Sequence, residues 1–276
     1  MTIYAYPFSN FYFHRMQTSE SNQSMLPYQT RQVFGFPVAV STVDTIGQFL
    51  SEKAQVTDSP FLVAAADVHV ITRGVHEAEF GQVLENMDLI CPDGMPIVWK
   101  LNRGQAPDAP IASRVSGPDL MLNMVERAAS SPELKHFLLG GDEEMLATLT
   151  QKLGEKFPGF VPVGVYSPPF RDWTDEDYAE MREKIATSGA NVVWVGLGCP
   201  KQERWMSDQR HLLPPAVYLG VGAAFAFHAG TVKRAPLWMQ KNGLEWLYRL
   251  YKEPGRLFRR YLTHNSLFLW YLFRGK

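Results

Sequence analysis

Polar residues that directly follow short apolar runs are the parts of this sequence best placed to do chemistry. Four such edges stand out, and they read Ala64-Ala65-Ala66-Asp67-Val68-His69, Cys91-Pro92-Asp93-Gly94, Leu139-Gly140-Gly141-Asp142 and Gly196-Leu197-Gly198-Cys199-Pro200-Lys201-Gln202-Glu203. In an open parallel sheet, ligands bind outside the carboxyl ends of the strands, so the residues that matter should directly follow the strands. We therefore take these four edges as the candidate site.

The second edge offers a candidate general base. Asp93 is a carboxylate just past an apolar run, and Gly94 behind it lets a substrate approach the backbone. A side chain in such a position can take a proton from a reacting group. An equally ordinary interpretation is that Pro-Asp-Gly forms a turn in which Asp93 caps the next helix. The local sequence leaves both interpretations open.

The fourth edge is suited to a phosphate. Gly196 and Gly198 end an apolar run, and Pro200 suits the first turn of a helix, so free N–H groups there can face an anion. Lys201 adds a compact positive charge and Gln202 a neutral donor and acceptor, although Lys-Gln-Glu is also an ordinary solvated first turn. The third glycine of the dinucleotide fingerprint is missing, which disfavours a nicotinamide-dependent oxidoreductase.

Two further glycine pairs follow apolar runs, at Gly140-Gly141 and at Gly220-x-Gly222. Either pair can extend a phosphate-binding edge, or it can serve only to let a strand pack tightly against a helix. We keep both pairs as weaker candidates.

The sequence gives little support to metal chemistry or covalent catalysis. Asp175-Glu176-Asp177 has the form of the Asp-x-Asp that holds a divalent cation in many sugar transferases, but a helix N-terminus favours acids in any case. The seven histidines show no ligand spacing, and no Gly-x-Ser-x-Gly elbow or Cys/His pair is present. We expect no metal and no cofactor.

The elements that must position these edges alternate along the chain. Short β-branched runs are separated by amphipathic stretches of helical period, a pattern typical of βαβ units. The predicted strands are Phe36–Ser41, part of Phe61–Thr72, Asp88–Pro92, His136–Gly140, Val161–Tyr166, Asn191–Gly196 and Val217–Val221. Ser116 and Thr174 each precede a carboxylate by three residues, which predicts helix starts with capping boxes. The predicted fold is α/β, a doubly wound, mostly parallel Rossmann-like sheet.

Composition divides the chain of 276 residues into three parts. Residues 1–33 turn Ser/Gln-rich and are expected to form a poorly ordered N-terminal extension, residues 34–235 the α/β catalytic domain, and residues 236–276 an α-helical appendage in which Pro254 begins a new helix. Residues 233–276 hold ten Lys/Arg and two Asp/Glu, so the remainder is left with a net charge of −9. This basic end implies a partner.

Cysteine usage and apolar runs indicate a cytoplasmic protein. Only Cys91 and Cys199 are present, each in an apolar run, which fits a reducing compartment. The longest candidate for a membrane span, 212–229, is broken by two prolines and a histidine. The first residues lack the basic and apolar regions of a signal peptide.

Taken together, these motifs resemble the WecG/TagA/CpsF family of bacterial glycosyltransferases over roughly residues 34–271. The matching segments are 88–99, 114–121, 195–205, 220–225 and 235–250. The resemblance implies an inverting, metal-independent transfer of a hexosyl or N-acetylmannosaminyl group from a UDP-sugar. The acceptor it implies is a polyprenyl-diphosphate-linked sugar, in cell-surface polysaccharide assembly such as exopolysaccharide biosynthesis.

The resemblance also implies roles for individual residues. Asp93 corresponds to the catalytic base, Arg114 to a basic residue near the diphosphate, and Gln202 to a polar residue of the pocket. The further residues expected to bind substrate are Ala65, Asp67, Gly94, Gly140, Gly141, Gly198, Lys201, Glu203, Gly222, Arg249, Arg256 and Arg259.

Two positions depart from the pattern of the family. Its usual Thr-x-Asn stands here as Ala65-Ala66-Asp67, which removes a hydroxyl and adds a charge. Ala226 stands where the family commonly has Asp. We expect donor-sugar recognition to differ accordingly.

The appendage is expected to attach the protein to the inner face of the cell membrane. In the family this region is thought to reach the membrane and to close over the active site. A basic helical end with Trp246 and Trp270 suits an anionic membrane surface independently of the resemblance. The alternative is that the basic helix packs on the acidic body of its own protomer. A nucleic-acid partner is disfavoured because the surrounding residues are apolar and aromatic.

A second function from another class stays open. A non-catalytic nucleotide-sugar-binding or scaffold protein would keep the fold after losing the two polar residues at the departures. Asp93, Arg114 and Gln202 favour the enzyme. The sequence does not define the donor sugar or the oligomeric state, and a homo-oligomer is compatible with it.

Overall fold

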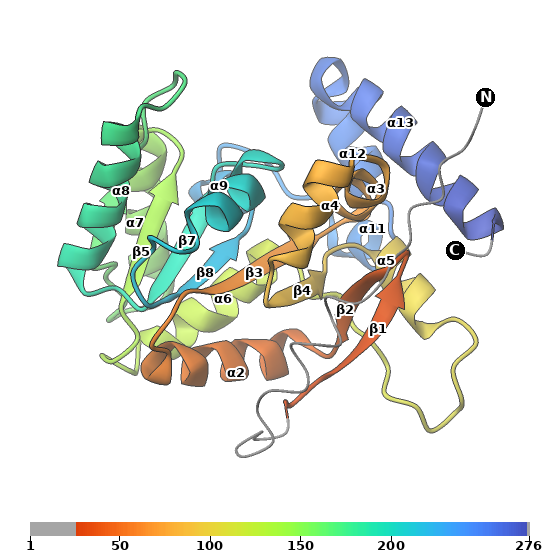
Figure 1. Cartoon of the computed structure of the whole chain (residues 1–276), viewed down its shortest axis with the longest axis horizontal. Coiled ribbons are helices and arrows are strands. Elements are labelled where there is room, and N and C mark those ends of the chain that lie inside the picture. The colour runs from red at the N-terminus through yellow and green to blue at the C-terminus, as the bar shows by residue number, and fades with distance from the viewer. Residues whose placement is uncertain (1–25, 275–276) are drawn as a thin grey trace.

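The computed structural model describes residues 26–274, which form an eight-stranded sheet between two layers of helices (Figure 1). The strands are β1 (Gln29–Val33), β2 (Phe36–Val40), β3 (Phe61–Ala66), β4 (Leu89–Pro92), β5 (His136–Gly140), β6 (Gly164–Tyr166), β7 (Val192–Gly196) and β8 (Val217–Gly220). Their order is β1-β2-β4-β3-β8-β7-β5-β6, and every pair is parallel except β1 with β2. The prediction of a doubly wound, mostly parallel α/β sheet is confirmed.

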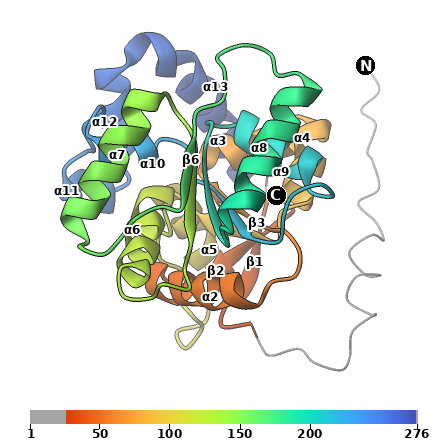
Figure 2. The ribbon, with the colours of Figure 1, turned by 90° about the vertical axis from the view of Figure 1, so that its left-hand side faces the viewer.

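Side chains that alternate along the strands build one core on each face of the sheet. In β3, Leu62 and Val63 point to opposite faces, and both are buried. One face is covered by α3 (Val68–His76), α4 (Ala78–Glu85), α8 (Asp175–Ser188) and α9 (Lys201–Gln209). The other is covered by α2 (Val43–Val56), α6 (Gly117–Ala128), α7 (Glu143–Lys156) and α10 (Ala224–Ala229). Figure 2 shows the sheet edge between these two layers.

The helix starts carry the caps that the sequence predicts, with one difference. Thr174 and Asp177 form a reciprocal capping box at the start of α8. Ser116 Oγ accepts from the main-chain N–H of Asp119 at the start of α6, and its hydroxyl donates to Asp119 Oδ2. The Asp119 carboxylate also accepts from arginines and does not bond to the main-chain N–H of Ser116 as a capping box requires. The bonds between Asp119 and the arginines link the start of α6 to the site described below.

The sheet begins earlier than the boundary predicted at residue 34. Residues 29–33 pair with β2 as an antiparallel edge strand, and Phe34 and Gly35 form the two-residue turn between them. Both turn residues have positive φ, at 52° and 98°, which matches the twist of a tight hairpin. Of the predicted N-terminal extension, residues 1–25 lie outside the described residues.

The C-terminal appendage is helical, as predicted, and packs on the α/β body. It consists of α11 (Leu237–Lys241), α12 (Glu245–Lys252) and α13 (Pro254–Phe273), and Pro254 is the first residue of α13. The rings of Phe268 and Tyr271 lie 5.3 and 5.4 Å from the ring of Phe34. None of the helices within residues 26–274 has both the length and the hydropathy needed to cross a membrane.

Candidate active site

The four predicted edges come together at one cavity of about 1420 Å³, which lies where strands β3, β4, β5, β7 and β8 end. A short helix, α5 (Met95–Asn102), and the appendage helices α12 and α13 complete its walls. Of the predicted residues, those that line it are Ala65, Asp67, Asp93, Gly94, Arg114, Gly141, Gly198, Lys201, Gln202, Gly222, Arg249 and Arg256. Gly140, Glu203 and Arg259 do not line this cavity.

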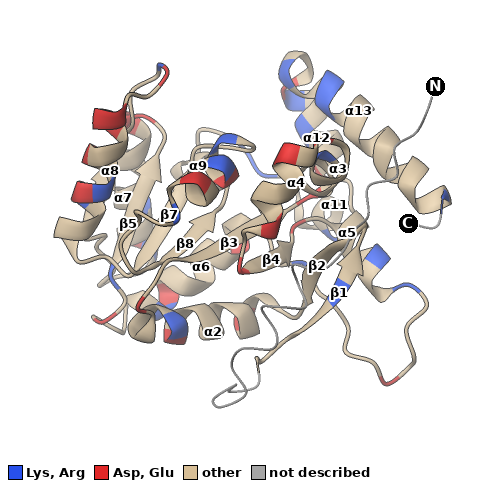
Figure 3. Ribbon diagram, in the orientation of Figure 1, with Lys and Arg blue, Asp and Glu red and all other residues tan. Residues whose placement is uncertain are grey.

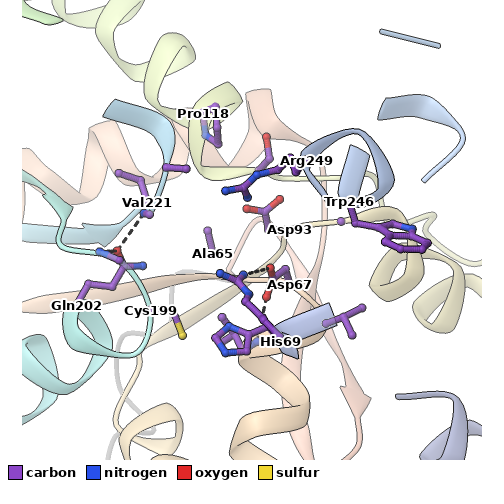
Figure 4. Close-up of a pocket in the computed structure, with 18 of the residues that line it drawn as sticks. Ala65, Asp67, His69, Asp93, Pro118, Cys199, Gln202, Val221, Trp246 and Arg249 are labelled. Carbon is purple, nitrogen blue, oxygen red and sulfur yellow. Dashed lines mark hydrogen bonds and ion pairs between the residues drawn. The ribbon is translucent and has the colours of Figure 1, made fainter. Parts of the chain in front are cut away.

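Asp93 sits at the centre of the carboxyl edge. Its main-chain N–H donates to the Ala66 carbonyl oxygen at 3.0 Å, which ties the end of β4 to the end of β3. The interpretation of Asp93 as a helix cap does not hold, because α5 begins after Gly94 and no side chain caps it. Figure 4 shows the Asp93 side chain inside the cavity, between Gln202 on one side and Trp246 on the other.

The surroundings of Asp93 suit proton transfer near neutral pH. Burial raises the pKa of Asp93 to about 7, and the negative charges of Asp67 and Glu245 act in the same direction. Arg114 and the main-chain N–H of Gly117, 3.5 Å from Asp93 Oδ2, lower that pKa. A carboxyl group with such a pKa can both accept and release a proton under cellular conditions.

Asp67 is bound on both carboxylate oxygens. Oδ1 accepts from the Val70 N–H at 2.9 Å and so caps α3, and Oδ2 accepts from Arg260 Nη2 of α13 at 3.0 Å. Burial alone would raise the pKa of Asp67, but the charge of Arg260 holds it below its ordinary value. Asp67, which stands where the Thr-x-Asn pattern has Asn, is therefore an ionised, paired carboxylate.

Gln202 binds the loops and the glutamate around it with both polar atoms of its side-chain amide. Its Oε1 accepts from the N–H groups of Gly198 and Gly222, at 3.2 and 3.0 Å, and its Nε2 donates to Glu203 Oε1 at 2.8 Å. Two of the amides expected to face a phosphate are thus taken by this side chain. Gln202 clips the β7 and β8 edges together, and Glu203, whose pKa burial raises, lies fully buried beneath it.

The glycine pair after β5 divides into two roles. A Cβ on Gly140 would lie 2.7 Å from the main chain of Gly196, so this glycine allows the close pairing of β5 with β7. Gly141 has a φ of +70° and lines the cavity. The tight-packing interpretation therefore describes Gly140, and the binding interpretation stays a prediction for Gly141.

The loop between β6 and α8 forms the rim of the cavity beside Gly141 and the start of α9. Lys201 Nζ lies 3.6 Å from the centre of the Trp173 ring, and partial burial lowers the pKa of Lys201. Phe170 of the same loop also lines the cavity and is strongly exposed. An aromatic and cationic rim of this kind can hold a nucleotide at its base and phosphate ends.

Arg114 donates to three acceptors of the protein. Nη1 donates to Glu245 Oε2 at 2.7 Å, and Nη2 donates to Asp119 Oδ2 and Gln240 Oε1 at 3.0 and 2.9 Å. Asp119 also binds Arg234, with 2.9 Å between Oδ2 and Nη2. Arg114 therefore joins the start of α6 to α11 and α12 beside the cavity.

The appendage contributes a different set of arginines from the predicted one. Arg249 lines the cavity with its Nε buried and without an acceptor among residues 26–274, and Arg256 lines it while pairing with Glu253. Arg259 is exposed outside the cavity, and its neighbour Arg260 takes the inward place. The reason is helical phase, because Arg259 lies about 200° around the helix from the buried Leu257.

The segment considered as a metal site has a structural role. Asp177 accepts from the N–H of Thr174 and from Arg171, whose Nη2 lies 2.9 Å from Oδ1. Asp175 begins α8 directly after the cap. Across residues 26–274, no group of three or more His, Cys, Asp or Glu side chains is placed to hold a metal ion.

Comparison with known proteins gives concordant matches. The model of the "Glycosyl transferase WecG/TagA/CpsF family" matches residues 31–276. An N-acetylglucosaminyldiphosphoundecaprenol N-acetyl-beta-D-mannosaminyltransferase of Bacillus spizizenii is 31% identical over 201 residues, which cover 73% of this chain and 74% of the relative. A protein of the same name from Bacillus subtilis is 26% identical over 228 residues, covering 83% and 86%.

Proposed function

The chain belongs to the WecG/TagA/CpsF family of glycosyltransferases, and from this premise we propose an inverting, metal-independent transfer from a UDP-sugar to a polyprenyl-diphosphate-linked sugar. The donor sugar is N-acetylmannosamine or a related hexose, and the product enters cell-surface polysaccharide. The observation that carries the proposal is the position of Asp93, a carboxyl group with a pKa of about 7 in the wall of a cavity large enough for both substrates.

The reaction follows from that position. The oxygen of the acceptor hydroxyl attacks the anomeric carbon from the side opposite the UDP oxygen, and Asp93 takes the proton of that hydroxyl. The new C–O bond forms as the bond to UDP breaks, so configuration inverts and the diphosphate leaves with the added negative charge. Cationic groups that line the cavity, Lys201 and Arg249 among them, can stabilise that charge. A positioned base contributes about 10²–10⁴-fold to such a rate.

The two ends of the cavity differ in character, which suggests how the substrates lie. The donor fits the end where Gly141, Gly198 and Gly222 meet the rim formed by Trp173 and Lys201. The other end lies between α5 and α13, and its apolar lining residues are Met95, Trp99, Trp246, Leu269 and Leu272, with Lys100, Arg103 and Asn265 beside them. We assign this end to the acceptor and the first part of its prenyl chain.

The appendage also fits attachment to the membrane in which such an acceptor resides. Ten of the nineteen large hydrophobic side chains that are exposed in the described part of the chain lie within residues 237–273, so exposed apolar surface is concentrated there. Lys and Arg residues gather on α12 and the first half of α13 (Figure 3). Apolar and basic side chains together bind anionic lipid surfaces, which supports a peripheral position on the inner membrane face.

The proposal is tested by incubating the protein with a panel of UDP-sugars and a short-chain polyprenyl-diphosphate sugar. We expect release of UDP and a product of inverted configuration with at least one donor. Asp93→Asn should lose most turnover while still binding the UDP-sugar. Binding of a UDP-sugar without turnover in the wild-type protein would instead support a non-catalytic nucleotide-sugar-binding protein. Near-wild-type turnover of Asp93→Asn would remove Asp93 as the base.

A further inference from the structure

Two carboxylates stand side by side at the centre of the cavity. Asp67 and Asp93 follow the neighbouring parallel strands β3 and β4, in which Ala66 pairs with Pro92. The hydrogen bond of 3.0 Å from the Asp93 N–H to the Ala66 carbonyl oxygen fixes their separation through the main chain. Both side chains line the cavity, and Figure 4 shows them one above the other. A charge on one is therefore felt by the other.

The carboxylate of Asp67 is tied to the appendage. Arg260 of α13 reaches Oδ2 at 3.0 Å, across 193 residues of chain, and Figure 4 marks a contact at Asp67 with a dashed line. Oδ1 stays on the Val70 N–H at the start of α3, so the side chain is held from two directions. The pair is partly shielded, with 25% of the Arg260 and 34% of the Asp67 side chain exposed.

Arg260 reaches Asp67 because α13 is seated on α3. Thr72 Oγ1 lies 2.8 Å from His264 Nδ1, and the rings of His69 and His264 meet edge to face at 4.4 Å. Burial lowers the pKa of His69 to about 3, so this contact is made by a neutral ring. A displacement of α13 would break the histidine contact and the Asp67–Arg260 pair together.

Titratable groups from several elements surround the two carboxylates. Around Asp67 lie Arg260, Tyr261 and His264 of α13, Arg249 of α12, His69 of α3, and Cys199 and Glu203 at the start of α9. Around Asp93 lie Asp67, Arg114, Arg234, Glu245 of α12 and Cys91 of β4. The ionised partner of Asp67 is thus mainly Arg260, whereas Asp93 faces two other carboxylates and two arginines.

We propose that Asp67 is a positioning residue for the transfer reaction, whose carboxylate, kept ionised by Arg260 when α13 is seated, favours proton uptake by the neighbouring Asp93. The inference rests on the proposed function, because it concerns the base of that reaction. The acceptor hydroxyl loses its proton to Asp93, and Asp67 gains and loses none. Seating of the appendage and readiness of the base are then linked through one ion pair.

The electrostatic shifts agree with this arrangement. Burial is the largest cause that raises the pKa of Asp93 to about 7, and the charge of Asp67 is the next. Asp67 can act in this way only if it stays ionised, and Arg260 is the largest influence that lowers its pKa against the effect of burial. A like charge nearby disfavours ionisation, so the removal of that charge should make Asp93 more acidic.

The test removes the charge of Asp67 and keeps one of its two oxygens. Asp67→Asn can still cap α3 through Oδ1, but it loses the negative charge and the acceptor that Arg260 binds. We expect the acid limb of the profile of kcat/KM against pH, set by Asp93, to move to lower pH by about one unit. Because the tie to Arg260 is lost in this variant, we expect amide hydrogen exchange of α13 to be faster than in the wild-type protein, as in Arg260→Gln. An acid limb that does not move would overturn the proposal.

Two further variants complete the test. Arg260→Gln should speed amide exchange in α13, since it removes the tie, and unchanged exchange would contradict the link between seating and Asp67. Asp44→Asn is the matched control, because it breaks a carboxylate–arginine pair with Arg127 on the far helix layer and should leave the acid limb in place. If Asp93→Asn itself kept the wild-type pH profile, the assignment of the base would fail rather than the role of Asp67.

Discussion

Nη1 of Arg114 lies 2.7 Å from Oε2 of Glu245, so a residue of the α/β body is ion-paired to the first residue of α12. The pair is largely shielded, with 14% of the Arg114 and 21% of the Glu245 side chain exposed. Burial of this kind makes the loss of one partner costly, because the other charge remains without its counterion. The appendage is therefore held to the body at the wall of the active site.

Arg114→Ala should slow turnover strongly, and we expect much of that loss to come from a displaced appendage. Glu245→Gln should act in the same direction, and the two changes together should cost less than the sum of their separate effects. Residues in direct contact typically show coupling energies of about 0.5–3 kcal/mol. Stability and kcat/KM of both single variants and the double variant measure it. Additive effects would mean that Arg114 acts on the substrate alone.

The parts of this site that follow from strand order were predictable from sequence. Asp93 directly follows an apolar run and Gln202 lies in the first turn of the helix after another, and runs of that kind form the parallel sheet whose carboxyl edge binds ligands. The role of Gln202 was not predictable, because its contact with Gly222 depends on β7 and β8 being neighbours. The local sequence pattern predicts which residues lie at the carboxyl edge of the sheet. The pairing of the strands in the fold decides which of their polar atoms remain available to a ligand.

Two other features, the inward arginine of α13 and the first strand, could not be predicted from the sequence, because they depend on the rotation of a helix and on the geometry of a tight turn. Arg259 and Arg260 are equivalent in a list of basic residues, and only the packing of Leu257 and Tyr261 on the body turns Arg260 inward. Arg260 could have been sought from sequence as the counterion that Asp67 needs in an apolar site. The first strand was missed because its turn uses Phe34 at a positive φ, where glycine or asparagine is the usual signal.

The raised pKa of Asp93 makes the stability of the protein depend on pH. In the folded protein this pKa is about 7, whereas an exposed Asp has a value of about 4. The folded state therefore holds the proton more tightly, and the stabilisation is complete below about pH 4 and lost as pH rises through about 7. Asp93→Asn should melt at a higher temperature than the wild-type protein at pH 8, with a gain that shrinks towards pH 5. A gain that grows on acidification would contradict the shift.

Turnover should not depend on a divalent cation. In the cavity wall Arg249 has a buried Nε that finds no acceptor in the described part of the chain, and Lys201 lies at the rim, so fixed positive charge is available to the departing diphosphate. We expect EDTA to leave the initial rate intact and Arg249→Gln to reduce it. Loss of activity in EDTA that magnesium or manganese restores would replace this assignment with a metal-assisted one.

Trp99 should discriminate acceptors by the length of their prenyl chain. Its side chain is 52% exposed at the apolar end of the cavity, where it lies against Gly243. Trp99→Ala should raise KM for a long-chain acceptor and leave KM for a short, water-soluble acceptor nearly unchanged. Trp173→Ala at the opposite rim should raise KM for the UDP-sugar with either acceptor. Equal effects of Trp99→Ala on both acceptors would place the prenyl chain elsewhere.

Attachment to membranes should depend on the outward face of α13 and can be tested without removing the helix. Deletion of α13 would uncover Phe34, against which Phe268 and Tyr271 pack, so single substitutions are the cleaner test. Phe258 and Leu262 are 56% and 60% exposed, and Arg259 lies on the same outward side. Phe258→Asp and Leu262→Asp should each reduce sedimentation with anionic liposomes, because apolar surface is lost and a repelled charge is added.

The salt dependence of liposome binding and a matched control variant distinguish a specific membrane contact of α13 from non-specific adhesion of the protein to liposomes. The electrostatic part should weaken as the screening length falls from about 10 Å at 0.1 M salt to about 3 Å at 1 M. Arg259→Gln should therefore reduce binding at low salt and have little effect at high salt. Val161→Asp, a substitution of a residue that is 77% exposed and far along the chain from the appendage, should leave binding unchanged. If the α13 variants bound liposomes as strongly as the wild-type protein does, this face would not be the membrane contact. If the variants that lose liposome binding also lost turnover on the short acceptor, its role would not be purely membrane-directed.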